Sequence, residues 1–115
     1  MLKIYHNPRC SKSRETLSLL QQQAAQVEIV DYLKTPPSAE ELTQLLHLLG
    51  LTARELLRTK EDDYQQLALD NPSLTEQQLI EAMVAHPKLI ERPIVVKGNK
   101  AVIGRPPSNV LTLLP

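Results

Sequence analysis

The sequence predicts an α/β fold in which helices pack on a mixed four-stranded sheet. A strand pattern, a helical pattern and a second strand pattern follow one another at the N-terminus, which is the order of a βαβ unit. Two further strand patterns flank a Gly-Asn turn near the C-terminus, and a helical segment follows them. A long helical stretch separates the two halves. The 115 residues suffice for one core, so we expect a single domain over 1–115.

The N-terminal half begins with LKIY at 2–5, an apolar strand that ends at the loop HNPRC. From Ser11 onward, helical spacing predicts a helix to about Gln23, with an inward stripe of Thr16, Leu17 and Leu20. The segment VEIVDY at 27–32 alternates and is rich in β-branched residues, so it is the second strand. TPPS then interrupts the chain before the helical middle.

Three helix starts in the middle have the spacing of a capping box, in which side chains satisfy free backbone donors; the pairs are Ser38 with Glu41, Thr52 with Glu55, and Thr75 with Gln78. After them, PIVV (93–96) and AVIG (101–104) flank Gly98-Asn99, a good two-residue hairpin turn. SNVLTLL (108–114) is the last predicted helix. A right-handed βαβ unit joined to a ββα unit is the plan of a thioredoxin-like fold.

Composition narrows the class of function. The formal net charge is zero and only three residues are aromatic, which argues against a nucleic-acid binder. No apolar run approaches membrane-spanning length, and the N-terminus lacks the apolar core of a signal peptide. One cysteine cannot form an internal disulfide. We therefore expect a protein of the reducing cytoplasm without nucleic-acid or membrane partners.

The single cysteine lies in HNPRCSKSR, among Arg9, Lys12 and Arg14 and without a nearby acid. Cys10 precedes the predicted helix, where free N–H groups and cations lower a thiol pKa. His6 could add positive charge or a hydrogen bond. A buried, inert cysteine is the alternative. No metal site is expected, because one Cys and three scattered His do not form a ligand cluster. Ser13 occupies the second position of a CxxC motif, which excludes a dithiol mechanism.

Three arginines have unusual settings: Arg58 in ELLRTKE, Arg92 in ERPIVV and Arg105 in IGRPP. The last two precede proline, so they are expected in extended backbone, one before a strand and one after a strand. Strand-end positions of this kind can converge on the cysteine loop. Guanidinium groups suit a tetrahedral oxyanion. Taken singly, each arginine is more typical of a solvated or salt-bridged surface residue.

These blocks together resemble the glutaredoxin-dependent arsenate reductase family along essentially the whole chain. HNPRCSKSRETL is similar to the family's active-site loop, LLR and RPIVV to two of its arginine motifs, and GRP to the third. The resemblance implies a catalytic Cys10 supported by His6, with Arg58, Arg92 and Arg105 binding the substrate. It also implies a cis peptide before Pro93. CSKS in place of CGTS and the absence of a longer C-terminal tail resemble the shorter, housekeeping-type branch.

The implied reaction is the reduction of arsenate, or a similar oxyanion, through a thiol–arsenate intermediate on Cys10. Glutathione is the expected co-substrate and glutaredoxin the partner that resolves the mixed disulfide, with no bound cofactor and a monomeric enzyme. Two alternatives stay open. One is a regulator of the same fold that binds RNA polymerase, and the other is a glutathione-linked thiol oxidoreductase with a substrate other than arsenate.

Overall fold

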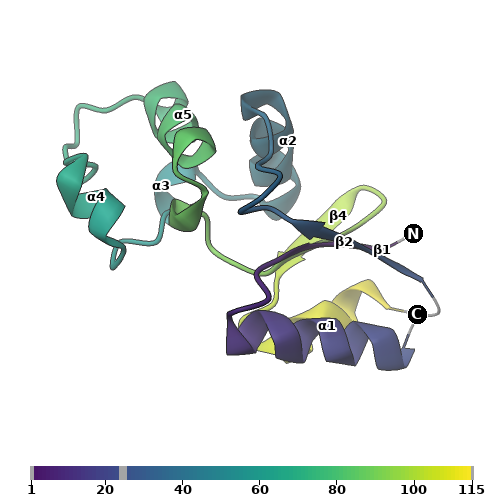
Figure 1. The fold of residues 1–115 in the computed structure, drawn as a ribbon. Coiled ribbons are helices and arrows are strands. Elements are labelled where there is room, and N and C mark those ends of the chain that lie inside the picture. The colour runs from purple at the N-terminus through teal and green to yellow at the C-terminus, as the bar shows by residue number, and fades with distance from the viewer. Residues whose placement is uncertain (1, 24–25, 115) are drawn as a thin grey trace. The chain divides into compact units, whose positions relative to one another are not determined.

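The computed structural model describes residues 2–23 and 26–114, which group into two compact units (Figure 1). The first unit consists of Met1–Thr35 and Arg92–Pro115, and it contains the sheet. The second unit is Pro36–Glu91 and is helical. The predicted α/β class is therefore correct, with strands from both ends of the chain in one sheet.

The sheet has four strands in the order β2-β1-β3-β4. The strands are β1 (Leu2–His6), β2 (Val27–Asp31), β3 (Ile94–Lys97) and β4 (Lys100–Ile103). β1 pairs in parallel with β2 and antiparallel with β3, and β3 pairs antiparallel with β4. This mixed four-stranded sheet confirms the predicted βαβ and ββα units.

Helix α1 (Ser11–Gln23) and the 3-10 helix η2 (Pro107–Leu113) lie side by side along one face of the sheet (Figure 1). Their apolar residues close a core against the two central strands; the buried members are Leu2, Ile4, Leu20, Val95, Val110 and Leu113. Removing these side chains from water is the main force that holds α1 on the sheet. Because α1 starts directly after the loop that follows β1, this packing fixes its N-terminus at one end of the sheet.

The β3–β4 hairpin turns at Gly98-Asn99, as predicted, with Gly98 in the left-handed region (φ 60°). Beyond β4 the chain touches α1 at Gly104, where a Cβ atom would lie 2.7 Å from Thr16 Oγ1 and 2.9 Å from Pro93 Cγ. The Thr16 hydroxyl lies 3.2 Å from the Gly104 carbonyl oxygen and 2.8 Å from that of Lys12, within its own helix. Only glycine permits this approach, which brings the next residue to the start of α1.

The second unit contains α2 (Ala39–Leu49), α3 (Ala53–Leu56), α4 (Asp62–Gln66), α5 (Glu76–Ala85) and the 3-10 helix η1 (Pro87–Leu89). Capping boxes begin α3 at Thr52 and α5 at Thr75, and Ser38 Oγ accepts the Glu41 N–H at the start of α2. Their buried apolar faces include Leu42, Leu45, Leu46, Leu56, Leu79, Ile80 and Met83. The predicted helix starts are thus confirmed.

The structure differs from the prediction in the C-terminal segment and in the helical middle. The C-terminal segment forms the 3-10 helix η2 rather than an α-helix, and it begins with a proline that lacks an N–H. Helix α4 was not predicted, because DDYQQ has no apolar stripe and none of its residues is buried. Neither difference changes the end of the sheet where the cysteine loop lies.

Candidate active site

Cys10 is placed at the N-terminus of α1 by a tight turn after β1. Its N–H donates to the Asn7 carbonyl oxygen (3.0 Å), and its own carbonyl accepts the first helical hydrogen bond, from Arg14 N–H (3.0 Å). This is the geometry of an N-cap residue. The sulfur therefore faces the free N–H groups of the first helical turn, among them those of Lys12 and Ser13.

Two of the three predicted arginines meet this sulfur. Arg105 Nη2 donates to Cys10 Sγ at 3.3 Å, and Arg105 Nε donates to the Arg92 carbonyl oxygen at 2.7 Å. Arg92 precedes β3 and Arg105 follows β4, which are adjacent at this end because Ile94 pairs with Ile103. Both the Arg92–Pro93 and the Arg105–Pro106 peptides are cis; the first of these confirms the prediction for Pro93.

The pKa of Cys10 lies below its ordinary value although partial burial acts to raise it. The opposing influences are the N–H groups of Ser13 and Lys12, and the positive charge and hydrogen bond of Arg92. Each of these stabilises the thiolate relative to the thiol. Cys10 is half-buried and remains accessible, so the site favours the thiolate form of an accessible sulfur and does not resemble an inert core thiol.

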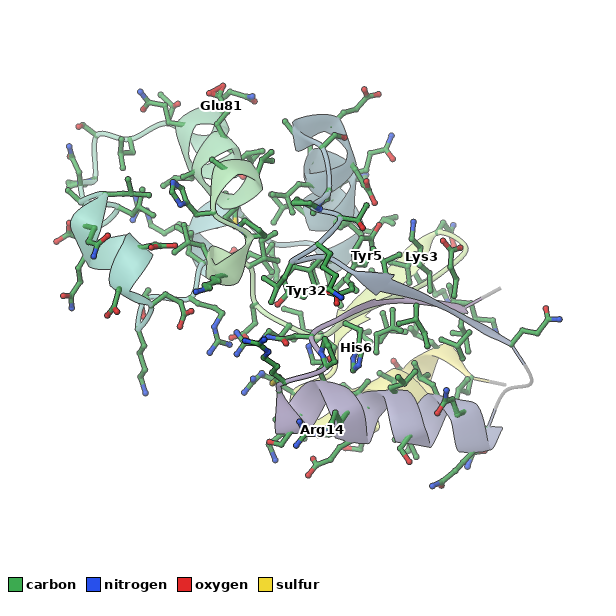
Figure 2. The ribbon with its side chains drawn as sticks, in the orientation of Figure 1. Lys3, Tyr5, His6, Arg14, Tyr32 and Glu81 are labelled. Atoms are coloured by element: carbon green, nitrogen blue, oxygen red, sulfur yellow. The ribbon has the colours of Figure 1, made fainter. Side chains whose placement is uncertain are left out.

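His6 acts on this loop through Ser13. Its Nδ1 lies 2.6 Å from Ser13 Oγ, which also accepts the Asn7 N–H at 3.0 Å. Since Ser13 is fully buried, its hydroxyl proton needs an acceptor, and His6 Nδ1 supplies one. Burial lowers the pKa of His6, with Asp31 opposing this and Arg14 adding to it. A neutral His6 thus contributes a hydrogen bond rather than a positive charge. Figure 2 labels His6 at the end of β1 and Arg14 near the start of α1.

The other predicted arginine, Arg58, belongs to the second unit. Its N–H donates to the Leu89 carbonyl oxygen (2.8 Å), and Nη1 forms an ion pair with Glu91 Oε1 at 2.7 Å. Nε is buried and has no hydrogen-bond partner among the described residues. A role for Arg58 beside the thiol therefore stays a prediction.

The described residues 2–23 and 26–114 contain no group of three or more His, Cys, Asp and Glu side chains that could hold a metal ion. None of the helices in the same ranges combines the length and apolar character needed to span a bilayer.

Comparison with known proteins identifies the family of this chain. The model of the ArsC family matches residues 5–113, from the end of β1 to the end of η2. The chain belongs to the ArsC family. The family match includes the cysteine loop and the segments that carry all three arginines. The resemblance drawn from the sequence motifs is confirmed.

Individual relatives align with this chain over nearly their full lengths. The chain is 58% identical to "Uncharacterized protein YfgD" of Escherichia coli, covering 98% of this chain and 96% of that protein. It is 49% identical to "Arsenate reductase" of Neisseria meningitidis serogroup A, covering 98% and 97%. Among solved structures, the arsenate reductase from Vibrio cholerae shares 51% identity with a TM-score of 0.95, covering 98% and 97%. These similarities also establish the thioredoxin-like fold.

Proposed function

We propose that this protein reduces arsenate to arsenite, with Cys10 as the nucleophile. The observation that carries the proposal is the Cys10 sulfur at the N-terminus of α1, with Arg105 Nη2 at 3.3 Å and Arg92 lowering its pKa. A nucleophilic thiolate and anion-binding guanidinium groups are the two requirements for attack on an oxyanion. The relative from Neisseria meningitidis and the structure from Vibrio cholerae, both named arsenate reductase, support this choice of oxyanion.

In the first step the Cys10 thiolate attacks arsenic(V) of dihydrogen arsenate. The S–As bond forms, one As–O bond breaks, and hydroxide leaves, so no electrons are transferred yet. The guanidinium groups of Arg92 and Arg105 donate hydrogen bonds to the arsenate oxygens. Charged hydrogen bonds of this kind are worth about 1.5–3 kcal/mol each. We place Arg58 as the third oxyanion ligand, as the family resemblance implies.

In the second step a thiol attacks the Cys10 sulfur. A sulfur–sulfur bond forms, the S–As bond breaks, and its electron pair stays on arsenic, which leaves as arsenic(III) in arsenite. The thiol's proton passes to an arsenite oxygen. Because the chain has no second cysteine, this thiol comes from solution, and we propose glutathione. Glutaredoxin then attacks the glutathione sulfur by thiol–disulfide exchange and returns Cys10 to the thiol. Such a cycle needs a reducing compartment, which fits the cytoplasm.

The test is arsenite formation from arsenate with glutathione and glutaredoxin present. Wild-type protein turns over, and Cys10→Ser does not, since a hydroxyl of similar size supplies no thiolate at neutral pH. Circular dichroism checks that the variant is folded, and Cys10→Ala controls for any chemistry of the new hydroxyl. Turnover by Cys10→Ser well above the enzyme-free background would remove Cys10 from the mechanism. Wild-type protein without activity toward arsenate would remove arsenate as its substrate.

A further inference from the structure

A hollow lies beside the cysteine loop, on the side of β2. It has a volume of about 330 Å³ and is lined by Asn7, Pro8 and Arg9 of the loop and by Asp31, Leu33 and Lys34 at the end of β2 and after it. All six residues belong to the first unit. The two arginines at the sulfur, Arg92 and Arg105, do not line it. This hollow is therefore distinct from the place where Arg92 and Arg105 meet the sulfur, although Arg9 is the chain neighbour of Cys10.

The charges around the hollow form a specific set. Arg9 and Lys34 are exposed cations contributed by two separate segments. Asp31 is half-buried, and its Oδ1 is buried without a hydrogen-bond partner among the described residues. A buried carboxylate oxygen without a donor is costly, so a ligand ammonium at this wall would compensate a charge that the protein leaves under-satisfied. The lining thus presents two positive groups and one negative group.

We propose that this hollow is the subsite for the thiol co-substrate, a small thiol peptide with two carboxylates and one ammonium. Glutathione has these groups, so its charges match the lining one for one: the carboxylates face Arg9 and Lys34, and the ammonium faces Asp31. The volume lies within the range of small-molecule pockets, roughly 300–1,000 Å³. A three-residue peptide extends over about 10 Å. In the hollow, its central thiol would therefore reach Cys10, the residue that follows Arg9. This inference rests on the proposed thiol-dependent function.

The other two cations near Cys10, Lys12 and Arg14, have other partners. Lys12 Nζ lies 3.7 Å from Glu15 Oε2 in the same helix, and Arg14 Nη1 donates to the Pro8 carbonyl oxygen. In the sequence, Arg9, Lys12 and Arg14 all lie close to Cys10. The structure singles out Arg9 from that group and adds Lys34, 25 residues further on, because the end of β2 lies beside the end of β1.

The experiment measures how fast the Cys10 thiolate reacts with two disulfides in the absence of arsenate. Attack on oxidised glutathione forms the Cys10–glutathione disulfide and releases one glutathione thiolate, and intact mass spectrometry follows the product. The second reagent, bis(2-hydroxyethyl) disulfide, undergoes the same exchange but is uncharged. The variant Arg9→Ala/Lys34→Ala removes both cations of the subsite. The variant Lys97→Ala/Lys100→Ala removes the same charge from the same unit, at the β3–β4 hairpin turn.

The subsite predicts that Arg9→Ala/Lys34→Ala slows the reaction with oxidised glutathione about tenfold, since two exposed ion pairs are worth a few-fold each. The reaction with the uncharged disulfide stays within about twofold of wild type, as do both reactions of the hairpin control. Lys34→Arg, which keeps the charge, retains the wild-type rate. An equal loss with both reagents, or no loss with oxidised glutathione, overturns the proposal.

The readout also separates this proposal from the proposed function. Charge-selective exchange in a protein that does not reduce arsenate would leave the subsite standing and reject arsenate as the substrate. If the protein reduces arsenate but Arg9→Ala/Lys34→Ala reacts with oxidised glutathione as fast as wild type, the proposed function stands and the subsite is rejected. Both substituted residues are exposed, and thermal unfolding confirms that the double variant has the wild-type fold.

Discussion

Replacing Arg105 by alanine should raise the pKa of Cys10. The guanidinium nitrogen Nη2 lies 3.3 Å from the sulfur. At that distance a unit charge pair interacts by about 1.3 kcal/mol in a water-like medium and about 5 kcal/mol at an effective dielectric constant of 20. Because Cys10 is half-exposed, the lower end applies, about 1.3 kcal/mol. Losing an interaction of this size favours the thiol over the thiolate, so the pKa of Cys10 is expected to rise.

The sign follows from the charged form. With Nη2 at 3.3 Å from the sulfur, the Arg105 guanidinium should favour the thiolate and so move the appearance of the reactive form to lower pH. Without Arg105 the same thiolate fraction is reached only at higher pH. A more basic thiolate is also a better nucleophile, which recovers part of the lost rate. The midpoint of the pH profile is therefore a more sensitive quantity than the rate at one pH.

The assay is the pH dependence of alkylation by iodoacetamide, which reports only Cys10 because the chain has no other cysteine. Arg105→Ala should shift the midpoint to higher pH. Lys100→Ala removes an exposed charge from the hairpin turn and should leave the midpoint within about 0.2 units, since distant exposed charges are screened. A midpoint that stays in place or moves down in Arg105→Ala refutes the assignment of Arg105 to the sulfur.

Two further predictions concern the surroundings of the site. Gly104→Ala should lower the free energy of unfolding by about 1–3 kcal/mol, because the new methyl group would lie 2.7 Å from Thr16 Oγ1 and 2.9 Å from Pro93 Cγ; an unchanged melting temperature in thermal denaturation contradicts it. Arg58→Ala should reduce kcat/KM for arsenate about tenfold or more, the scale of one charged hydrogen bond, without moving the alkylation midpoint of Cys10. Unchanged steady-state kinetics would exclude Arg58 from the oxyanion site.

Much of the fold was predictable because its local signals agree with one another. LKIY and VEIVDY have strand patterns, the hairpin has a Gly-Asn turn, and Thr52 and Thr75 start their helices with capping boxes that the structure contains. The segment 62–66 was missed because a short polar helix without a buried residue leaves no periodic signal. The last segment was predicted as a helix, and the structure shows a 3-10 helix that begins with a proline and packs against α1 and β4.

The site residues that lie in recognisable motifs were predictable. The contacts that depend on the tertiary fold were not. Cys10 at a helix start and Arg92 and Arg105 at strand ends follow from sequence, and the structure brings these three residues together. The bond between His6 and Ser13 was not foreseen, because it requires the turn that places the first turn of α1 over the end of β1. The hollow beside Asp31 and Lys34 also depends on the pairing of β2 with β1.

The central claim is that electrons reach arsenate through Cys10. The most direct measurement mixes the protein with arsenate and glutathione while glutaredoxin is withheld, and counts both products in the same sample. The account predicts a single burst of one arsenite per chain, accompanied by one glutathione on Cys10 in the intact mass, and then no further reaction until glutaredoxin is added. Continued arsenite formation by a protein whose Cys10 never carries glutathione would contradict it.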